Sequence, residues 1–288
     1  MGEGREVVVV EVKNVSKYYG RGFQALSNVS LTARKGERVV IVGPNGSGKT
    51  TLIKLIMGLS RPSSGYIEVF GARVGSRRYD SMRRRIGYMP EKTTLPLEVK
   101  VEDYLCVVSS IRGCSDYSEV TQALGLHRVY NRRISALSQG YKRRLLLAAA
   151  LTCNPELLVL DEPYANVDIE SKIVIDEILN TLPYDVTVLV ASHIRPSLER
   201  FRLLLMVSGQ IVSELTYEGE YAELTLTCNS GTYKLKVAQS KSDYRDTITK
   251  INSLIDSECR IQDISVVTFE KLLYEALKKH RSNLATLP

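Results

Sequence analysis

The sequence GPNGSGKTT, residues 43–51, follows a short apolar run at residues 39–42 and precedes a segment with helical periodicity. It fits the phosphate-loop pattern, in which a glycine and four further residues are followed by Gly-Lys-Thr. A glycine-rich turn between a buried strand and a helix directs several backbone N–H groups at one point, where the helix dipole favours an anion. The stretch therefore predicts an α/β fold in which a buried strand ends in a phosphate-binding loop.

The side chains of this loop indicate a nucleoside triphosphate and a divalent cation as ligands. Lys49 is long enough to reach the outer phosphates, and the hydroxyl of Thr50 can ligate Mg²⁺. The glycines let the backbone close around the anion without side-chain clashes. We expect ATP to contact Gly43, Asn45, Gly46, Ser47, Gly48, Lys49, Thr50 and Thr51.

A second segment, LLVLDEP at residues 157–163, combines an apolar strand with two carboxylates at its end. Asp161 is placed to hold Mg²⁺, directly or through water. Glu162 is placed to orient or deprotonate the water that attacks the terminal phosphate. Alone this string is weak evidence, because many apolar strands end in acidic residues where the chain reaches the surface. Together with the phosphate loop it predicts a nucleoside triphosphatase.

A third segment, LSQGYKRR at residues 137–144, precedes the acidic strand. In this order and at this spacing, the three segments resemble the nucleotide-binding domain of the ATP-binding cassette (ABC) family, and the resemblance covers roughly residues 7 to 212. LSQGYKRR is similar to the signature sequence of that family, which caps the ATP held by the phosphate loop of another subunit. The resemblance implies that Ser138, Gln139 and Gly140 contact ATP across a dimer. A serine at a helix start is also an ordinary N-cap, and both roles are compatible.

Three further residues take their expected roles from the same resemblance. Tyr19 stands where the family has an aromatic residue that stacks on adenine, with Tyr18 as the second choice. Asp168 matches the loop that communicates across the dimer, and we expect it to contribute to ATP binding. His193, after the apolar run VTVLVAS, matches the histidine that contacts the terminal phosphate. The expected catalytic residues are Lys49, Glu162 and His193.

Three positions in two segments depart from the family pattern. Glu91, in IGYMPEKTTL, stands where a glutamine commonly touches Mg²⁺ and senses the transporter. Its carboxylate can still ligate the metal, but it adds negative charge near the phosphates. In the signature, Gln139 and Tyr141 replace a commoner glycine and glutamine, whereas Ser138 and Gly140 are retained. We expect the metal ligands to be Thr50, Glu91 and Asp161.

Composition is typical of a globular intracellular protein. The 288 residues are 44% hydrophobic, enough for one large domain and a smaller one. No apolar run approaches the roughly 18 to 20 residues needed to cross a bilayer, and the N-terminus lacks a secretory signal pattern. The cysteines are odd in number and scattered, so we expect reduced thiols without a disulfide framework or a zinc site. They are Cys106, Cys114, Cys153, Cys228 and Cys259.

The net charge of +7 is concentrated in the first part of the chain, where 29 basic and 21 acidic residues precede Ile211. Basic clusters could face a nucleic acid, a nucleotide or an anionic membrane, or they could be solvated helix faces. The clusters lie at residues 77–78, 83–85, 132–133 and 142–144. No zinc-finger, basic-zipper or RNA-recognition pattern accompanies them, so no specific nucleic-acid partner is expected.

The order of patterns predicts a phosphate-loop NTPase core with smaller parts attached. An antiparallel β side sheet is expected before the phosphate loop, and later apolar strands imply a parallel sheet covered by helices. A helical subdomain is expected at about residues 93–150, within an ATPase domain of residues 1–212. Residues 213–288 predict a small α+β appendage, with a hairpin around CNSG, a helix at YRDTITKINSLI, a strand at IQDISVV and a helix at FEKLLYEALKK.

The combined prediction is an ATP-hydrolysing subunit of an ABC transporter, located on the cytoplasmic face of the cell membrane. With one phosphate loop and one signature, the chain needs a second ABC ATPase subunit, expected to be an identical copy, and a separate transmembrane permease. Export is favoured because Glu91, the basic residues after Gly140 and the C-terminal tail resemble exporter-type members. The alternatives are a non-transport ABC ATPase, for metal-cluster assembly, translation or DNA repair, and a regulatory nucleotide-binding module.

Overall fold

The computed structural model describes residues 7–20, 22–92, 94–193, 195–198, 200–217, 221–228, 231–238, 260–272, 274–275 and 278. The chain divides into two compact units, residues 1–215 and residues 216–288. The boundary expected from the sequence, after residue 212, lies three residues before this division. The larger unit contains every residue that the sequence predicted to bind or hydrolyse ATP.

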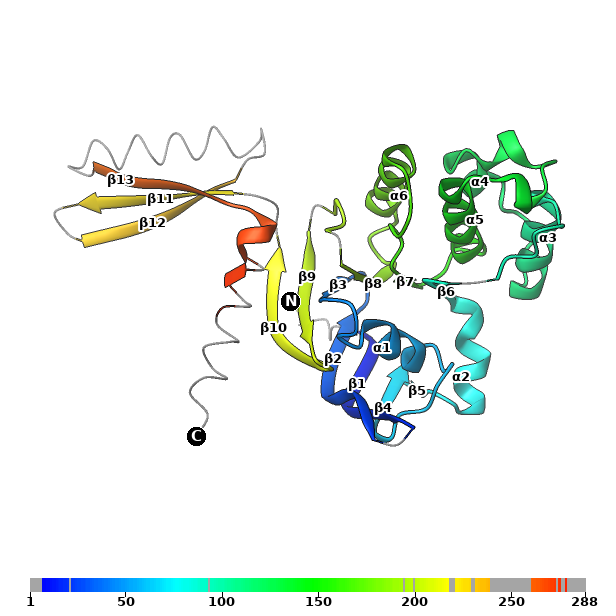
Figure 1. Cartoon of the computed structure of the whole chain (residues 1–288), viewed down its shortest axis with the longest axis horizontal. Helices are drawn as coiled ribbons and strands as arrows, with labels where there is room; N and C mark the ends of the chain where they lie inside the picture. Colours follow the sequence, from blue (N-terminus) through cyan, green and yellow to red (C-terminus); the bar gives the residue numbers. More distant parts are fainter. Residues whose placement is uncertain are drawn as a thin grey trace, which may run out of the picture. The chain divides into compact units, whose positions relative to one another are not determined.

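The side sheet of the larger unit is formed by strands on both sides of the phosphate loop in sequence. These strands are β1 (Val8–Tyr19), β2 (Phe23–Arg34), β4 (Ser64–Val69) and β5 (Ala72–Arg73). Their order is β2-β1-β4-β5, and β1 pairs antiparallel with both neighbours (Figure 1). Val10, Val12 and Val15 of β1 are buried in the core. The predicted antiparallel side sheet is therefore confirmed, with two strands that follow the loop added to it.

The central sheet carries the phosphate loop at the end of a buried strand. Its strands are β3 (Arg38–Val42), β6 (Ile86–Met89), β7 (Leu157–Asp161), β8 (Thr187–Ser192), β9 (Phe201–Val207) and β10 (Gln210–Tyr217). They lie in the order β10-β9-β3-β8-β7-β6, and each pair from β9 to β6 is parallel. Since parallel strands share one direction, their carboxyl ends bring the phosphate loop, the acidic pair and His193 to one edge.

Helices cover this sheet and form the expected helical subdomain. The helical segments, with η for a 3₁₀ helix, are α1 (Lys49–Ile56), α2 (Arg77–Met82), η1 (Arg83–Arg85), α3 (Val101–Arg112), α4 (Ser118–Ala123), η2 (Leu126–Val129), η3 (Ile134–Ala136), α5 (Gln139–Leu151) and α6 (Ile169–Thr181). α3 and α4 both contact α5, which links the subdomain to the core (Figure 1). Among the described residues, none of the helices has both the length and the apolar character that a membrane crossing requires.

The prediction that all cysteines are reduced is wrong for one pair. Cys114, shortly after α3, and Cys153, shortly after α5, form a disulfide with their Cα atoms 5.6 Å apart. The two cysteines are 39 residues apart in sequence, and only the packing of α3 against α5 brings them together. Arg112 joins the same helix ends, because its Nη1 donates a hydrogen bond of 2.7 Å to the carbonyl oxygen of Ala150.

The smaller unit contains a three-stranded antiparallel sheet of order β12-β11-β13, formed by β11 (Tyr221–Cys228), β12 (Gly231–Ala238) and β13 (Arg260–Val267). The hairpin predicted around CNSG and the strand predicted at IQDISVV are confirmed. Residues 269–272, 274–275 and 278 are helical, in agreement with the predicted last helix. The helix predicted at YRDTITKINSLI lies outside the described residues.

Candidate active site

The phosphate loop closes between β3 and α1. Gly43, the first residue after β3, packs so tightly that a Cβ atom there would lie 2.1 Å from the carbonyl oxygen of Met206. Gly48, directly before α1, has a φ of +103°, a conformation that other residues rarely adopt. Both positions therefore require glycine, and the shape of the loop follows from its sequence.

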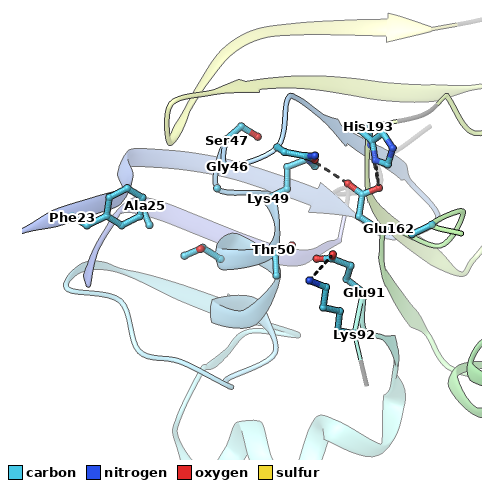
Figure 2. A pocket seen from close by; sticks show the side chains of 14 residues that line it. Phe23, Ala25, Gly46, Ser47, Lys49, Thr50, Glu91, Lys92, Glu162 and His193 are labelled. Atoms are coloured by element: carbon cyan, nitrogen blue, oxygen red, sulfur yellow. Dashed lines mark hydrogen bonds and ion pairs between the residues drawn. The ribbon is translucent and has the colours of Figure 1, made fainter. Parts of the chain in front are cut away.

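Lys49 extends back over this loop. Its Nζ donates hydrogen bonds to the carbonyl oxygens of Gly43, at 2.8 Å, and Pro44, at 3.2 Å. The same ammonium lies 3.5 Å from Oε1 of Glu162, and the two side chains are only 6% and 8% exposed. Figure 2 shows the two side chains pointing toward each other. Because Lys49 is also the first residue of α1, its charge adds to the positive end of the helix dipole.

Glu162 connects this lysine to His193. Its Oε2 lies 2.7 Å from Nδ1 of His193 and also accepts a hydrogen bond of 3.2 Å from the backbone N–H of that residue. The backbone of Glu162 has a φ of +49°, a left-handed conformation that is costly for a residue with a side chain. The chain therefore turns directly after β7 and holds the carboxylate between a lysine and a histidine.

Asp161 ends β7 and faces the first turn of α1. Its Oδ1 accepts a hydrogen bond of 3.1 Å from Oγ1 of Thr50, whereas Oδ2 is buried without a hydrogen-bond partner. Burial raises the pKa of Asp161 to about 6, and the charges of Glu91 and Glu162 add to this rise. A buried carboxylate oxygen that lacks a partner, beside a threonine hydroxyl, fits a Mg²⁺ ion, because the ion would satisfy the oxygen and offset its charge.

Lys49, Glu162 and His193 line a pocket of about 470 Å³ (Figure 2). The pocket combines the phosphate loop with residues from β2, from the segment after β6 and from the turns after β7 and β8. Its lining residues are Phe23, Ala25, Asn45, Gly46, Ser47, Gly48, Lys49, Thr50, Thr51, Glu91, Lys92, Glu162, Ala165 and His193. The fold therefore brings residues 45–51 together with Glu91, Glu162 and His193, whereas Gly43 and Asp161 are not part of this lining.

The position of Tyr19 does not match its expected role of stacking on adenine. Neither Tyr19 nor Tyr18 is among the residues that line the pocket, and the ring of Tyr19 lies 4.9 Å from Nζ of Lys17. Phe23, which pairs with Tyr19 across β1 and β2, does line the pocket and is 66% exposed. Phe23 was not predicted from the sequence, although a second aromatic residue four positions after Tyr19, with two glycines between them, was a usable signal.

The signature segment forms the start of α5, next to the start of α6. Ser138 is the N-cap of α5, and its Oγ accepts a hydrogen bond of 3.2 Å from the backbone N–H of Tyr141. Gly140 allows the close packing, because a Cβ atom there would lie 2.2 Å from Oγ of Ser171 and 2.5 Å from Oδ2 of Asp168. The signature and the Asp168 loop therefore form one packed unit.

This unit is separate from the pocket that contains Lys49. Ser138, Gln139, Gly140 and Asp168 do not line that pocket. Ser138 and Gln139 are exposed, so the N-terminus of α5 is open to solvent. Within the described chain, the signature residues expected to contact the phosphates therefore lie apart from the pocket that contains the phosphate loop.

A phosphate loop whose lysine faces a carboxylate at the end of another strand of the same sheet defines a phosphate-loop nucleoside triphosphatase. The family model described as ABC transporter matches residues 26–165. The zinc import ATP-binding protein ZnuC of Rickettsia bellii is 32% identical over 189 residues, which cover 64% of this chain and 76% of ZnuC. The chain belongs to the ABC transporter family, as an ATP-binding subunit with ATPase activity.

Two further comparisons agree with this assignment. The Nod factor export ATP-binding protein I of Burkholderia orbicola is 33% identical over 217 residues, 72% of this chain and 71% of that protein. The dimeric structure of a post-hydrolysis state of the ATP-binding cassette MJ0796, bound to ADP and Pi, matches with a TM-score of 0.66 and 26% identity, over 73% of this chain and 99% of that one. The predicted fold is thereby confirmed. ABC ATPase subunits act as dimers with transmembrane permease partners, and the relatives include an importer and an exporter.

Proposed function

We propose that this chain hydrolyses ATP in a dimer of identical subunits and so powers export through a separate transmembrane permease. The observation that carries the proposal is the position of Glu162 between Lys49 and His193, in a pocket that contains the phosphate loop. A cation for the outer phosphates, a base for water and a group that orients the base are what transfer of the terminal phosphate to water needs.

Glu162 is the general base in this proposal. His193 holds Oε2, whereas Oε1 shares the Lys49 ammonium with two backbone carbonyl oxygens. The terminal phosphate of bound ATP competes with Oε1 for that ammonium. Oε1 is then available to accept the proton of the attacking water, while the water oxygen bonds to the terminal phosphorus and the bond to ADP breaks.

A magnesium ion fits the residues between the first turn of α1 and the end of β7. Thr50 and Asp161 are the ligands that the geometry supports best, because Oδ2 of Asp161 is buried without a partner. Glu91 lines the same pocket and can add a third oxygen. When bound, the ion neutralises charge on the phosphate oxygens.

Phe23 is the better candidate for adenine recognition. Its exposed ring lines the pocket, and aromatic faces stack on nucleotide bases. Tyr19 lies on the paired strand and contacts Lys17. We therefore assign the stacking role to Phe23, with Tyr19 as the alternative that the sequence favoured.

The second half of each ATP site comes from the other subunit. Ser138 and Gln139 are exposed at the N-terminus of α5, where the helix dipole favours a phosphate. Asp168 packs against Gly140, so it is positioned to transmit contacts between the two sites. An identical partner is supported because one chain carries both a phosphate pocket and a signature helix.

The permease is proposed to bind beside the ATP pocket. A cleft of about 310 Å³ lies between the Glu91 segment and α5, and its lining includes Leu95 and Leu97. Val107 and Ile111 of the helical subdomain are 57% and 70% exposed, so these apolar side chains are not part of the core and can contact a partner. Binding there would hold the chain at the inner face of the membrane.

Export rather than import is supported by the longer alignment with the Nod factor export protein, 217 residues against 189 for ZnuC. The test uses proteoliposomes that contain the chain with its co-purified permease and expose the ATPase outside. ATP should then load compounds from a cell extract into the lumen, as detected by mass spectrometry against vesicles with Glu162→Gln. ATP-dependent loss of compounds from preloaded vesicles would instead establish import.

The first experiment on the ATPase itself is Glu162→Gln. This variant should retain ATP, lower kcat by roughly 100-fold or more, and shift from monomer to dimer in light scattering when ATP and Mg²⁺ are added. Glu177→Gln, an exposed carboxylate on α6, is the matched control and should leave turnover unchanged. Near-normal turnover of the Glu162 variant would reject the base assignment.

A further inference from the structure

Arg143 is a buried cation that the mechanism above does not use. It lies on α5 and is only 8% exposed. Its Nη1 donates a hydrogen bond of 3.1 Å to the carbonyl oxygen of Pro90, and its Nε donates one of 3.2 Å to the carbonyl oxygen of Ala165. Pro90 directly precedes Glu91, and Ala165 lies between Glu162 and Asp168. One guanidinium therefore ties the signature helix to two segments that border the ATP pocket.

The same guanidinium also lies in the field of the acidic residues of the site. Burial lowers the pKa of Arg143, and the carboxylates of Glu91, Asp161 and Glu162 oppose this shift. Glu91 and Arg143 line the same cleft of about 310 Å³. Lys92 also faces Glu91, at 3.9 Å, but its side chain is 90% exposed and its charge is screened by water. Arg143, which is buried and lines the same cleft as Glu91, is therefore better placed than Lys92 to compensate the charge of Glu91.

We propose that Arg143 is a positioning residue that holds the Glu91 segment and the loop before Asp168 in the arrangement for hydrolysis, and that its charge is matched to Glu91. Each carboxylate near the phosphates opposes the negative charge that the phosphoryl oxygens carry in the transition state of hydrolysis, and a buried cation offsets this effect. A neutral residue at position 143 leaves Glu91 without this compensation. The proposal rests on ATP hydrolysis at this site and is independent of the direction of transport.

A double-mutant cycle tests the charge match. Arg143→Gln should lower kcat about tenfold and change KM for ATP by less than about threefold, because the phosphate contacts remain. Adding Glu91→Gln to that variant should raise kcat at least about threefold, since the unmatched carboxylate is then removed. Arg143→Lys, which keeps the charge but loses the forked hydrogen bonds, should lie between wild type and Arg143→Gln. Purely additive effects in the cycle would overturn the charge match.

Hydrogen exchange in the nucleotide-free protein tests the positioning role without activity. Arg143→Gln should increase exchange at the amides of residues 91–92 and 164–168, whereas the amides in the middle of α5 keep their protection. Arg132→Gln removes an exposed charge of the same kind and should change neither exchange nor turnover. Arg143→Lys provides the same comparison if the glutamine variant does not fold. Unchanged exchange in both segments would overturn the positioning role even if turnover falls, and would leave the ATPase assignment intact.

Discussion

Nζ of Lys49 and Oε1 of Glu162 lie 3.5 Å apart, so the proposed phosphate-binding cation and the proposed general base are buried partners of each other. The two residues come from α1 and from the turn after β7, and the order of strands in the central sheet brings them together. Removing one partner of a buried pair leaves the other charge uncompensated, which commonly costs about 3 to 5 kcal/mol. Substitutions at either position therefore affect the electrostatics of the whole pocket.

Lys49→Ala should weaken ATP binding itself. Loss of a hydrogen bond to a charged group corresponds to roughly 1.5 to 3 kcal/mol, or at least a tenfold higher Kd. A titration with a fluorescent ATP analogue measures this change. Lys54→Ala removes an exposed lysine from the same helix and should bind normally. Equal affinities of the two variants would contradict the role assigned to Lys49.

Phe23→Ala should weaken ATP binding more than Tyr19→Ala does. Base stacking on an aromatic ring contributes about 1 to 3 kcal/mol, so an increase in Kd of about five- to 160-fold is expected for the Phe23 variant. Tyr19→Ala should change Kd by less than about twofold, because its ring contacts Lys17 and does not line the pocket. Calorimetric titration of both variants decides between the residues, and the reverse ranking would return the role to Tyr19.

In the absence of nucleotide and metal, Asp161→Asn should be more stable than the wild type. This difference in stability should increase as pH rises. Burial raises the pKa of Asp161 from 3.8 to about 6. A group with a raised pKa favours folding while it is protonated, and this contribution is lost as pH rises through the folded value. The shift corresponds to about 3 kcal/mol at most. Thermal unfolding in EDTA should show the difference between variant and wild type growing from pH 4 to pH 7. A constant difference would show that Asp161 ionises normally.

Cys114→Ser should lower the stability of the larger unit while its ATPase activity at moderate temperature persists. In the chain-entropy model, closing a loop of this size contributes about 4 kcal/mol. Denaturant unfolding with and without a reductant measures the contribution, and Cys106→Ser, at a free exposed cysteine, is the control. Alkylation of the unfolded, unreduced protein should leave Cys114 and Cys153 unmodified. Full alkylation would show that the bond is absent.

Elements whose signals are local formed where the sequence predicts them. The strand, glycine turn and helix around Lys49 form a continuous pattern, and Gly43 and Gly48 occupy positions that only glycine fits. The strand that ends in Asp161, directly before Glu162, is fully buried, as its apolar composition indicated. The hairpin in the smaller unit also formed where alternation predicted it.

The errors and omissions concern contacts between distant segments. The disulfide joins residues 39 positions apart, and no local pattern indicates which helix ends meet. The place of Phe23 in the pocket depends on how β2 lies relative to the phosphate loop. The buried contacts of Arg143 with Pro90 and Ala165 were hidden for the same reason, because a basic cluster in a sequence resembles a solvated helix face.

Residue types and their spacing along the chain were sufficient to establish the phosphate loop, the acidic pair, the signature and thus the chemistry of ATP hydrolysis. These motifs depend on backbone geometry over a few consecutive residues, and the local sequence determines that geometry. The pairing of Lys49 with Glu162, the unpartnered oxygen of Asp161 and the burial of Arg143 became visible only in the folded molecule. These features arise from the order of strands in the sheet and the packing of helices upon it, because burial and charge compensation depend on neighbours that are remote in sequence.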